Sequence, residues 1–567
     1  MHDMVIRDGL IVDGTGAAAF HGDVALNGDR IVQVGGKAGP GRREIAAAGR
    51  LVTPGFVDIH THYDGQATWD PWLAPSSWHG VTTIVMGNCG VGFAPVQRDR
   101  HEWLIGVMEG VEDIPGTALS EGIPWGWESF PEYLDVLDRM PRAIDIGAQL
   151  PHGALRAYVM GERGATNAPA MPDEIARMAD LAAEAMSAGA LGFTSSRTNV
   201  HRDKHGNHIP GYEVAVDELI GISAGLRRAG KGAIGVNVDF RDVDDEIAWM
   251  RRLQRISGRP VWFLLVQFND DPDKWKRILA ATKRASEENE PLLAQVAGRP
   301  IGFMLGLESS LHPFVSRQAY RAIAELPLAD RVARMRDPAV RDAIVGERVS
   351  HRSDIMRTVT QRFDRMFRLG DPPDYEPPPE LSAEAIGRRE GRDPAEVAYD
   401  MLLERDGQEL LFMPAFNYAA GDHADIAAMM AHPNTLLGLS DGGAHCGLIC
   451  DGSTPTYMLT HWARDRRRGP KLALEEVVRQ QTSGTAALYG LADRGVLAPG
   501  RKGDLNVIDF DGLTLRAPEM VRDLPAGGRR LVQRADGYDV TIVSGAVTRQ
   551  DGEATEALPG KLVRGGT

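Results

Sequence analysis

The feature that most constrains this chain is a long middle section in which apolar, β-branched runs alternate with helical patterns. This section extends from about residue 54 to residue 491. Continuous apolar runs are typical of strands buried on both faces of a parallel sheet, and the helices between them supply the crossovers. The pattern therefore predicts the α/β class and repeated βα units closed into a (β/α)8 barrel of the TIM type.

Nine runs qualify as strands, which is one more than such a barrel needs. We expect the run at 301–307 or the run at 410–415 to be irregular or to belong elsewhere. The other runs are residues 56–59, 81–86, 144–149, 190–194, 233–238, 261–268 and 436–439. Clear helical patterns cover 173–188 and 383–404, and Gly391 and Pro394 predict that the second is two helices.

The two ends of the chain have a different character from the middle. Residues 1–53 contain short alternating runs around an Asn27-Gly28 turn, and residues 493–567 repeat this around Asp511-Gly512. Such turns between alternating runs indicate hairpins. We expect both ends to form one small β-sandwich domain and residues 54–492 to form the barrel. Helices around 270–290 and 370–405 are expected as insertions, either a lid or solvated surface.

Charge and composition exclude several classes of function. The formal net charge is −15 and there is no polybasic block, so a nucleic-acid partner is disfavoured. No stretch approaches the roughly 20 apolar residues of a membrane helix, and the first residues lack the pattern of a signal peptide. Three cysteines are too few for a disulfide framework and suit the cytoplasm. We expect a cytoplasmic protein with a small-molecule substrate, and a homo-oligomer is compatible with the sequence.

Two histidines follow the first predicted strand of the barrel. His60 and His62 lie in the sequence Asp58-Ile-His-Thr-His. Strand side chains alternate, so both imidazoles emerge on one face and could chelate a divalent ion. The competing interpretation is a pair of hydrogen-bonded structural histidines. Their position at the carboxyl end of a strand, where barrel enzymes build their sites, favours the metal.

Two further elements place metal-ligand types at the same end of the barrel. Cys89 follows the second strand; it is either a thiolate ligand or an inert buried thiol. Asp441 follows a late strand, where its carboxylate could contact a metal and take a proton from water.

These motifs together resemble the amidohydrolase superfamily, in its N-acyl-D-amino-acid deacylase (D-aminoacylase-like) branch. The resemblance is carried by PGFVDIHTHYD (54–64), HGVTTIVMGNCG (79–90), PHGALRAYVMG (151–161), LGLSDGGAH (437–445) and GVLAPGRKGDLNVID (495–509). It implies a (β/α)8 barrel with a β-sandwich from both termini, and metal-assisted hydrolysis of an amide next to a D-configured carbon.

The resemblance also implies roles for individual residues. His60 and His62 match metal ligands, Cys89 the cysteine ligand near or between metals, and Asp441 a ligand that is also the general base. His152 matches a segment that lines the pocket.

Two of the family's metal-ligand histidines are missing from this chain. No histidine occurs between His208 and His312. Alignment with the family's pattern puts Asp239 at the first lost ligand and Leu265 at the second. Asp239, or His201, His205 or His208 from the preceding loop, could replace a lost imidazole. We favour one Zn²⁺ held by His60, His62 and Asp441, with Cys89 close, over a pair of ions.

Three other residues are candidates for substrate binding. Tyr63 could donate a hydrogen bond to an oxyanion, and Arg197 could bind a substrate carboxylate in a bidentate pair. His445 is expected near the pocket without a more specific role. Each has a structural alternative, such as a helix cap or a surface ion pair.

The sequence leaves three functions open. The first is a zinc-dependent hydrolase of a linear amide such as an N-acyl-D-amino acid. The second uses the same site on a lactone or cyclic amide, and the missing histidines make this more credible. The third is a catalytically degenerate barrel that only binds a ligand, which would leave the coexistence of the four candidate ligands as a coincidence.

Overall fold

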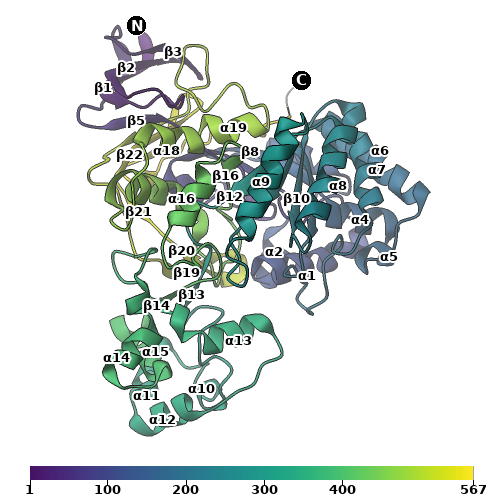
Figure 1. The fold of residues 1–567 in the computed structure, drawn as a ribbon. Helices are drawn as coiled ribbons and strands as arrows, with labels where there is room; N and C mark the ends of the chain where they lie inside the picture. Colours follow the sequence, from purple (N-terminus) through teal and green to yellow (C-terminus); the bar gives the residue numbers. More distant parts are fainter. Residues whose placement is uncertain (566–567) are drawn as a thin grey trace.

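The computed structural model describes residues 1–565 and has three parts: a barrel, a β-domain built from both chain ends, and a helical unit inserted late in the barrel (Figure 1). The β-domain and the inserted unit lie on opposite sides of the barrel in this view. No helix within residues 1–565 is long and apolar enough to cross a membrane.

Eight parallel strands form the barrel sheet, in the spatial order β16-β12-β11-β10-β9-β8-β7-β6. A parallel bridge between Thr61 and Gly442, just beyond β6 and β16, joins the two ends of this sheet. The predicted fold class is therefore confirmed. The strands are β6(Phe56–Asp58), β7(Val81–Met86), β8(Asp145–Pro151), β9(Gly192–Arg197), β10(Ala233–Val238), β11(Val261–Leu264), β12(Leu292–Val296) and β16(Thr435–Leu437).

Two of the nine predicted strands lie outside the barrel, and one barrel strand was not predicted. The runs at 301–307 and 410–415 give β13(Gly302–Leu305) and β15(Leu411–Pro414), which pair antiparallel with each other. The seventh barrel strand is instead β12, five residues long directly after a charged helix. Both misplaced runs are apolar because they are buried, and hydrophobicity alone does not say in which sheet a buried strand pairs.

Helices follow most barrel strands and cover the outside of the sheet (Figure 1). Residues 270–290, expected as an insertion, contain α9, which lies between β11 and β12 in the chain and therefore in the position of a barrel helix. The helices of this part are α1(His101–Glu112), α2(Gly116–Gly122), α3(Phe130–Arg139), α4(His152–Met160), α5(Glu162–Ala165), α6(Pro172–Ala188), α7(Val216–Ala229), α8(Val243–Ser257), α9(Lys274–Glu287), α16(Ala424–Met430), α17(Thr454–Tyr457), the π-helix η8(Met458–Asp465), α18(Leu474–Gln481) and α19(Ser483–Leu488).

The two chain ends share one nine-stranded sheet, in the order β24-β23-β22-β17-β5-β1-β2-β3 with β4 beside β1. The joint between the ends is the antiparallel pair β5–β17, in which Val52 lies opposite Val507. Apolar residues from both ends form a single core. The strands are β1(His2–Ile11), β2(Phe20–Asn27), β3(Arg30–Val34), β4(Gly41–Ala46), β5(Leu51–Pro54), β17(Leu505–Ile508), β22(Tyr538–Val543), β23(Ala546–Gln550) and β24(Glu553–Ala554). Shorter pairs join β18(Thr514–Leu515) with β21(Ala535–Asp536), and β19(Glu519–Leu524) with β20(Gly528–Val532).

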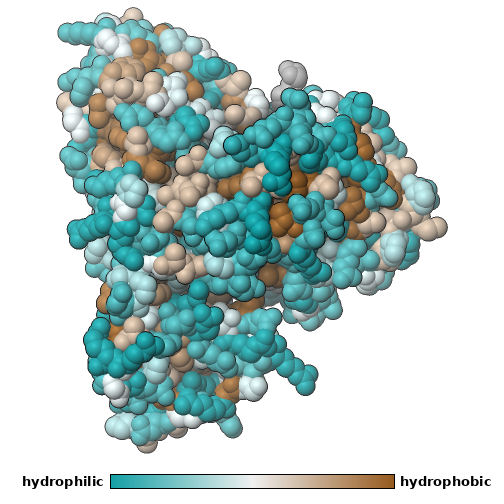
Figure 2. All heavy atoms as spheres, viewed as in Figure 1, coloured by the Kyte–Doolittle hydropathy of each residue, from teal (hydrophilic) through white to brown (hydrophobic). Residues whose placement is uncertain are grey.

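The inserted unit runs from β13 to β15 and has a hydrophobic core of its own. On the face seen in Figure 2 its surface is mainly hydrophilic, and a notch separates it from the barrel. It contains β14(Phe367–Arg368), α10(Gln318–Arg321), α11(Leu328–Met335), α12(Pro338–Gly346), α13(Asp354–Gln361), α14(Ala383–Glu390) and α15(Pro394–Leu402). The predicted break between the last two helices is present, with Gly391 in the left-handed conformation as the C-cap of α14.

Candidate active site

His60 and His62 lie just beyond β6, and their rings face one carboxylate. His60 Nε2 is 3.3 Å from Asp441 Oδ1, and His62 Nε2 is 3.4 Å from the same oxygen. Both imidazoles are fully buried. The backbone fixes this arrangement, because the Asp441 N–H donates to the His60 carbonyl and the His62 N–H donates to the Gly442 carbonyl.

Cys89 completes the group from the turn that follows β7. Its Sγ is 3.6 Å from His60 Nε2, and His60, His62 and Cys89 form a set whose ligand atoms all lie within 4.8 Å of one another. The turn depends on Gly87, because a Cβ there would lie 2.3 Å from the Gln149 carbonyl oxygen. The glycine therefore permits a close approach of the two backbones at this turn.

Two residues that the sequence did not identify hold the far side of each imidazole. Gln295 Oε1, on β12, lies 2.9 Å from His60 Nδ1. Glu112 Oε1, at the end of α1, lies 3.2 Å from His62 Nδ1. Nδ1 of His60 is hydrogen-bonded to an amide oxygen, and Nδ1 of His62 faces a carboxylate oxygen without a well-formed hydrogen bond. Nε2 of each ring is then left to face Asp441 and Cys89. The one sequence signal was Glu112 itself, an acid among the buried positions of α1.

The electrostatics of the group are those of charges buried together. Burial lowers the pKa of His60 to about 4 and raises that of the Cys89 thiol to about 11. Burial also disfavours the charged forms of Asp441 and His62, but their hydrogen bond and mutual attraction outweigh it. The Glu112 charge, followed by the contact with Asp441, holds the pKa of His62 well above its usual range, and the contacts with His62 and His60 hold the pKa of Asp441 below its usual range.

Asp239, the expected replacement ligand, is engaged elsewhere. Its carboxylate accepts hydrogen bonds from the Thr198 hydroxyl and the Asn199 N–H, the latter at 3.0 Å, and lies 3.8 Å from Arg241. Leu265 is buried and offers no ligand atom. The structure thus brings together His60, His62, Cys89 and Asp441, and leaves Asp239 outside that group.

Among the three loop histidines, His201 is the one whose pKa is shifted by charges of the candidate site. Burial and the charges of His445 and His62 lower the pKa of His201 to about 3. Its Nδ1 lies 2.9 Å from Ser196 Oγ. His208 instead stacks on Tyr212, and His205 is exposed.

The structure gives the candidate substrate-binding residues different partners. The Tyr63 hydroxyl lies 2.9 Å from Ser76 Oγ, and His152 is held between Ser195 and Glu218, 2.9 Å from each. Arg197 donates to the Val214 carbonyl and lies over the Trp249 ring. His445 Nε2 lies 3.7 Å from Oε2 of Glu112, the carboxylate that faces His62, and a quarter of its side chain is exposed.

The loop that carries Asp441 is strained. Leu439, Asp441 and His445 all have positive φ, at 59°, 48° and 52°. Non-glycine residues rarely adopt this conformation, and strain of this kind concentrates at functional sites. A parallel barrel with imidazoles, a thiol and a carboxylate gathered at the carboxyl ends of its strands has the architecture of the metal-dependent barrel hydrolases.

Comparison with known proteins agrees with this class. The model of the amidohydrolase family matches residues 43–549, and the chain belongs to that family. Over nearly its full length the chain is similar to a D-aminoacylase of Alcaligenes xylosoxydans xylosoxydans, with 27% identity covering 99% of this chain and 97% of that protein. An uncharacterised protein of Mycobacterium tuberculosis is 28% identical, covering 97% of this chain and 92% of that protein.

Solved structures show the same fold. A crystal structure of D-aminoacylase superposes with a TM-score of 0.65 at 24% identity, covering 100% of both chains. An N-acyl-D-glutamate deacylase from Bordetella bronchiseptica, complexed with zinc and a phosphonate inhibitor, gives a TM-score of 0.66 at 22% identity, covering 99% of both chains.

Proposed function

We propose that the protein is a metal-dependent amidohydrolase that cleaves the amide bond of an N-acyl-D-amino acid. The convergence of His60, His62, Cys89 and Asp441 at one end of the barrel is the observation that supports this most. The substrate class is supported by relatives of nearly the same length that are named D-aminoacylase and N-acyl-D-aspartate deacylase.

The donor set fits a zinc ion. In a tetrahedral zinc site, two nitrogen or oxygen ligands lie about 3.3 Å apart, and a nitrogen and a sulfur lie about 3.5 Å apart. The corresponding separations here are 3.3 Å and 3.4 Å to Asp441 and 3.6 Å to Cys89. His60, His62 and Asp441 would hold the ion, with Cys89 beside it. When bound, such an ion supplies Lewis-acid chemistry, polarising an amide carbonyl and acidifying water.

The residues of the chain then have distinct tasks in our proposal. Asp441, held ionised by its neighbours, accepts a proton from the attacking water and returns it to the leaving nitrogen. Gln295 and Glu112 hold the two imidazoles in one orientation, so that no reorganisation is needed during the reaction.

We favour one ion over two. Asp239 carries the carboxylate expected to complete a second site, but its two oxygens accept hydrogen bonds from Thr198 and Asn199. One neighbouring structure, a D-aminoacylase with a TM-score of 0.66 at 24% identity, is described as having a binuclear centre with one-metal activation and second-metal attenuation. A single ion is therefore compatible with catalysis in this fold.

We further propose the division of the chain into a catalytic unit at 54–492 and an accessory β-domain from 1–53 and 493–567. The cytoplasm is the proposed location, because Cys89, Cys446 and Cys450 are all free, buried thiols, and free cysteines are typical of reducing compartments.

The decisive experiment is to strip metal with a chelator, reload with zinc, and assay paired D and L forms of N-acetyl amino acids together with lactones. We expect zinc to restore hydrolysis of the D forms. His60→Ala should lose its activity and the zinc bound at His60, His62 and Asp441, whereas Asp239→Ala should keep that zinc. Turnover by the metal-free protein would refute the proposal. Zinc-dependent turnover of lactones alone would replace the substrate class, and binding without turnover would favour the degenerate barrel.

A further inference from the structure

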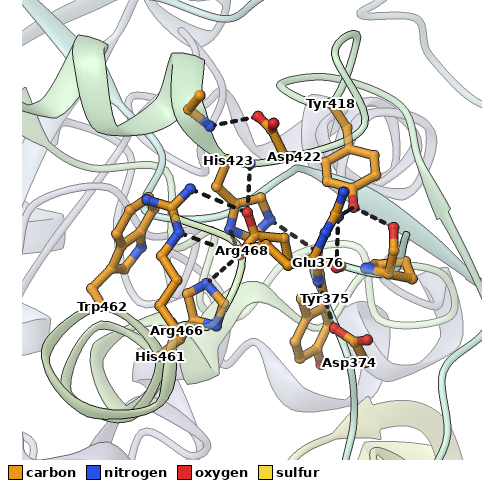
Figure 3. A network of polar contacts seen from close by, with 12 residues as sticks. Asp374, Tyr375, Glu376, Tyr418, Asp422, His423, His461, Trp462, Arg466 and Arg468 are labelled. Atoms are coloured by element: carbon orange, nitrogen blue, oxygen red, sulfur yellow. Dashed lines mark hydrogen bonds and ion pairs between the residues drawn. The ribbon is translucent and has the colours of Figure 1, made fainter. Parts of the chain in front are cut away.

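A second cluster of metal-ligand types shares no residue with the candidate active site. Figure 3 shows this second cluster and its polar contacts. It consists of Glu376, His423 and His461, whose ligand atoms lie within 4.8 Å of one another. Glu376 belongs to the inserted unit, His423 is the N-cap of α16, and His461 lies in the π-helix η8. Three segments that are distant in the sequence therefore meet at one point.

One oxygen of Glu376 is turned toward both imidazoles. Its Oε2 lies 3.0 Å from His461 Nε2 and 3.8 Å from His423 Nδ1. The other oxygen, Oε1, accepts the backbone N–H of His423 at 2.8 Å. The carboxylate is thus oriented by the backbone, and its Oε2 faces both rings while also accepting from Arg466 Nε at 3.3 Å.

The tautomer of His423 is set by its surroundings. Its Nε2 is 3.0 Å from the Tyr375 carbonyl oxygen, which can only accept a hydrogen bond, so Nε2 carries the proton. Its Nδ1 therefore presents a lone pair toward Glu376 Oε2, with the Tyr457 hydroxyl 3.3 Å away.

His461 completes the convergence without a well-formed hydrogen bond. Its buried Nε2, although near Glu376 Oε2, is off the direction of a good bond and has no hydrogen-bond partner among the described residues. The ring is positioned by stacking on Tyr457, with centroids 4.5 Å apart. Glu376 Oε2 and the two ring nitrogens thus face one another, an arrangement that a shared cation would stabilise.

We propose that Glu376, His423 and His461 bind a second divalent metal ion, in a structural role that fastens the inserted unit to the barrel. Two imidazoles and a carboxylate are a common zinc set, and the separations of 3.0 Å and 3.8 Å bracket the roughly 3.3 Å of a tetrahedral site. The bond from His423 to Tyr375 is the outer contact that such ligands normally make. A π-helix at His461 also fits, because π-helical turns are frequent at functional sites.

Arg466 limits how tightly this cluster holds a metal. Its Nε is 3.3 Å from Glu376 Oε2, its Nη2 is 3.2 Å from Oε1, and its guanidinium lies over the Trp462 ring. The carboxylate is therefore already paired with one positive charge. The alternative is that a proton on His461, with Arg466, closes the network without any metal.

The test uses the full-length double variant His60→Ala/His62→Ala, which removes the ligands of the proposed active site. After metal stripping and reloading with zinc, elemental analysis should find about one equivalent retained. Adding His461→Ala should abolish it, whereas the control His432→Ala, outside the cluster, should not. Glu376→Gln serves as a second probe if His461→Ala does not fold.

Thermal unfolding of the same proteins gives an independent readout. Zinc should raise the midpoint of the double variant by several degrees, because it binds only the folded state. The shift should vanish in Glu376→Gln. A double variant that retains no zinc and shows no shift would overturn the proposal in favour of the protonated network. Neither result depends on whether the active site hydrolyses amides.

Discussion

The two clusters use similar ligand types in opposite surroundings. The group at His60, His62 and Cys89 is built from consecutive strand ends of the barrel and has an ionised carboxylate, Asp441, facing its imidazoles. The cluster at Glu376, His423 and His461 joins separate segments, and an arginine occupies its carboxylate. A hydrolytic site needs a base within reach of water, whereas a structural site needs only saturated ligands. The proposed hydrolytic and structural roles therefore differ mainly because of the residues around each cluster, and less because of the ligand types.

The largest expected effect tests the base at the first cluster. Asp441→Asn should reduce kcat by at least about 1,000-fold, because the amide cannot accept the proton of the attacking water. Steady-state kinetics on the best N-acyl-D-amino acid would measure this. Asp239→Asn is the matched control and should change kcat little, since its contacts are with Thr198 and Asn199. Equal losses in both variants would remove the distinction between the two carboxylates.

The next effect concerns the arginine at the second cluster. Arg466 is buried against Glu376, and removing one partner of a buried pair typically costs about 3–5 kcal/mol of unfolding free energy. Arg466→Gln should therefore be strongly destabilised in chelator but partly rescued by zinc, which can take over the charge of Glu376. Denaturant unfolding with and without zinc would show this, and Arg467→Gln is the neighbouring control. A loss that zinc does not reduce would count against the metal.

A smaller effect is expected at the carboxylate behind His62. Glu112→Gln should weaken zinc binding at the first cluster by about 10–100-fold, because outer contacts of this kind orient a ligand and raise its basicity. Competition with a chromophoric chelator would measure the affinity. Glu109→Gln, on the same helix but paired with Lys204 at the surface, should bind zinc like the unmodified protein. Identical affinities in both variants would show that Glu112 does not support His62.

The smallest expected effect is a pH dependence of the unfolding free energy that needs no metal and arises from one buried histidine in the barrel and one in the inserted unit. Burial lowers the pKa of His79 in the barrel and of His312 in the inserted unit to about 3. The unfolded value is about 6.5, so their stabilising effect is complete above that pH and declines as the pH falls toward 3. In that pH range, each of the two histidines should lower the free energy of unfolding by up to about 1.4 kcal/mol per pH unit as the pH falls.

Unfolding free energies of the metal-free protein between pH 7 and pH 5 would measure this slope. His79→Gln should flatten it, because Gln remains neutral while keeping polar contacts to Thr456 and Gln533 within reach. An unchanged slope would mean that His79 does not titrate as its burial implies.

Local patterns predicted much of the fold. The helix expected at 173–188 is α6(Pro172–Ala188), and the break at Gly391 and Pro394 separates α14 from α15. These features depend on propensity, capping and backbone freedom, which neighbouring residues encode. The identity of the barrel strands is different, because β12 and the β13–β15 pair are distinguished only by which distant strand each one contacts.

The site shows the same difference between features encoded by neighbouring residues, which could be predicted, and features set by distant contacts, which could not. His60, His62, Cys89 and Asp441 stand in short motifs at strand ends, so sequence analysis could name them. Gln295 and Glu112 stand in no such motif, and they approach the imidazoles only through the closure of the barrel.

The second cluster is the clearest case of a group that sequence patterns could not predict. Glu376, His423 and His461 are separated by tens of residues in the chain, and no spacing rule relates them. Only the docking of the inserted unit brings the carboxylate to the two rings.

The β5–β17 pair has a consequence for how this protein is made. Pro54 pairs with Leu505, so 450 residues must be synthesised between the two partners. At about 5–20 residues per second, β5 emerges from the ribosome roughly 25–90 seconds before its partner. During that interval the edge of the amino-terminal half-sheet is open to other nascent chains, so in vivo yield should depend on chaperone capacity and translation speed more than on the stability of the finished molecule.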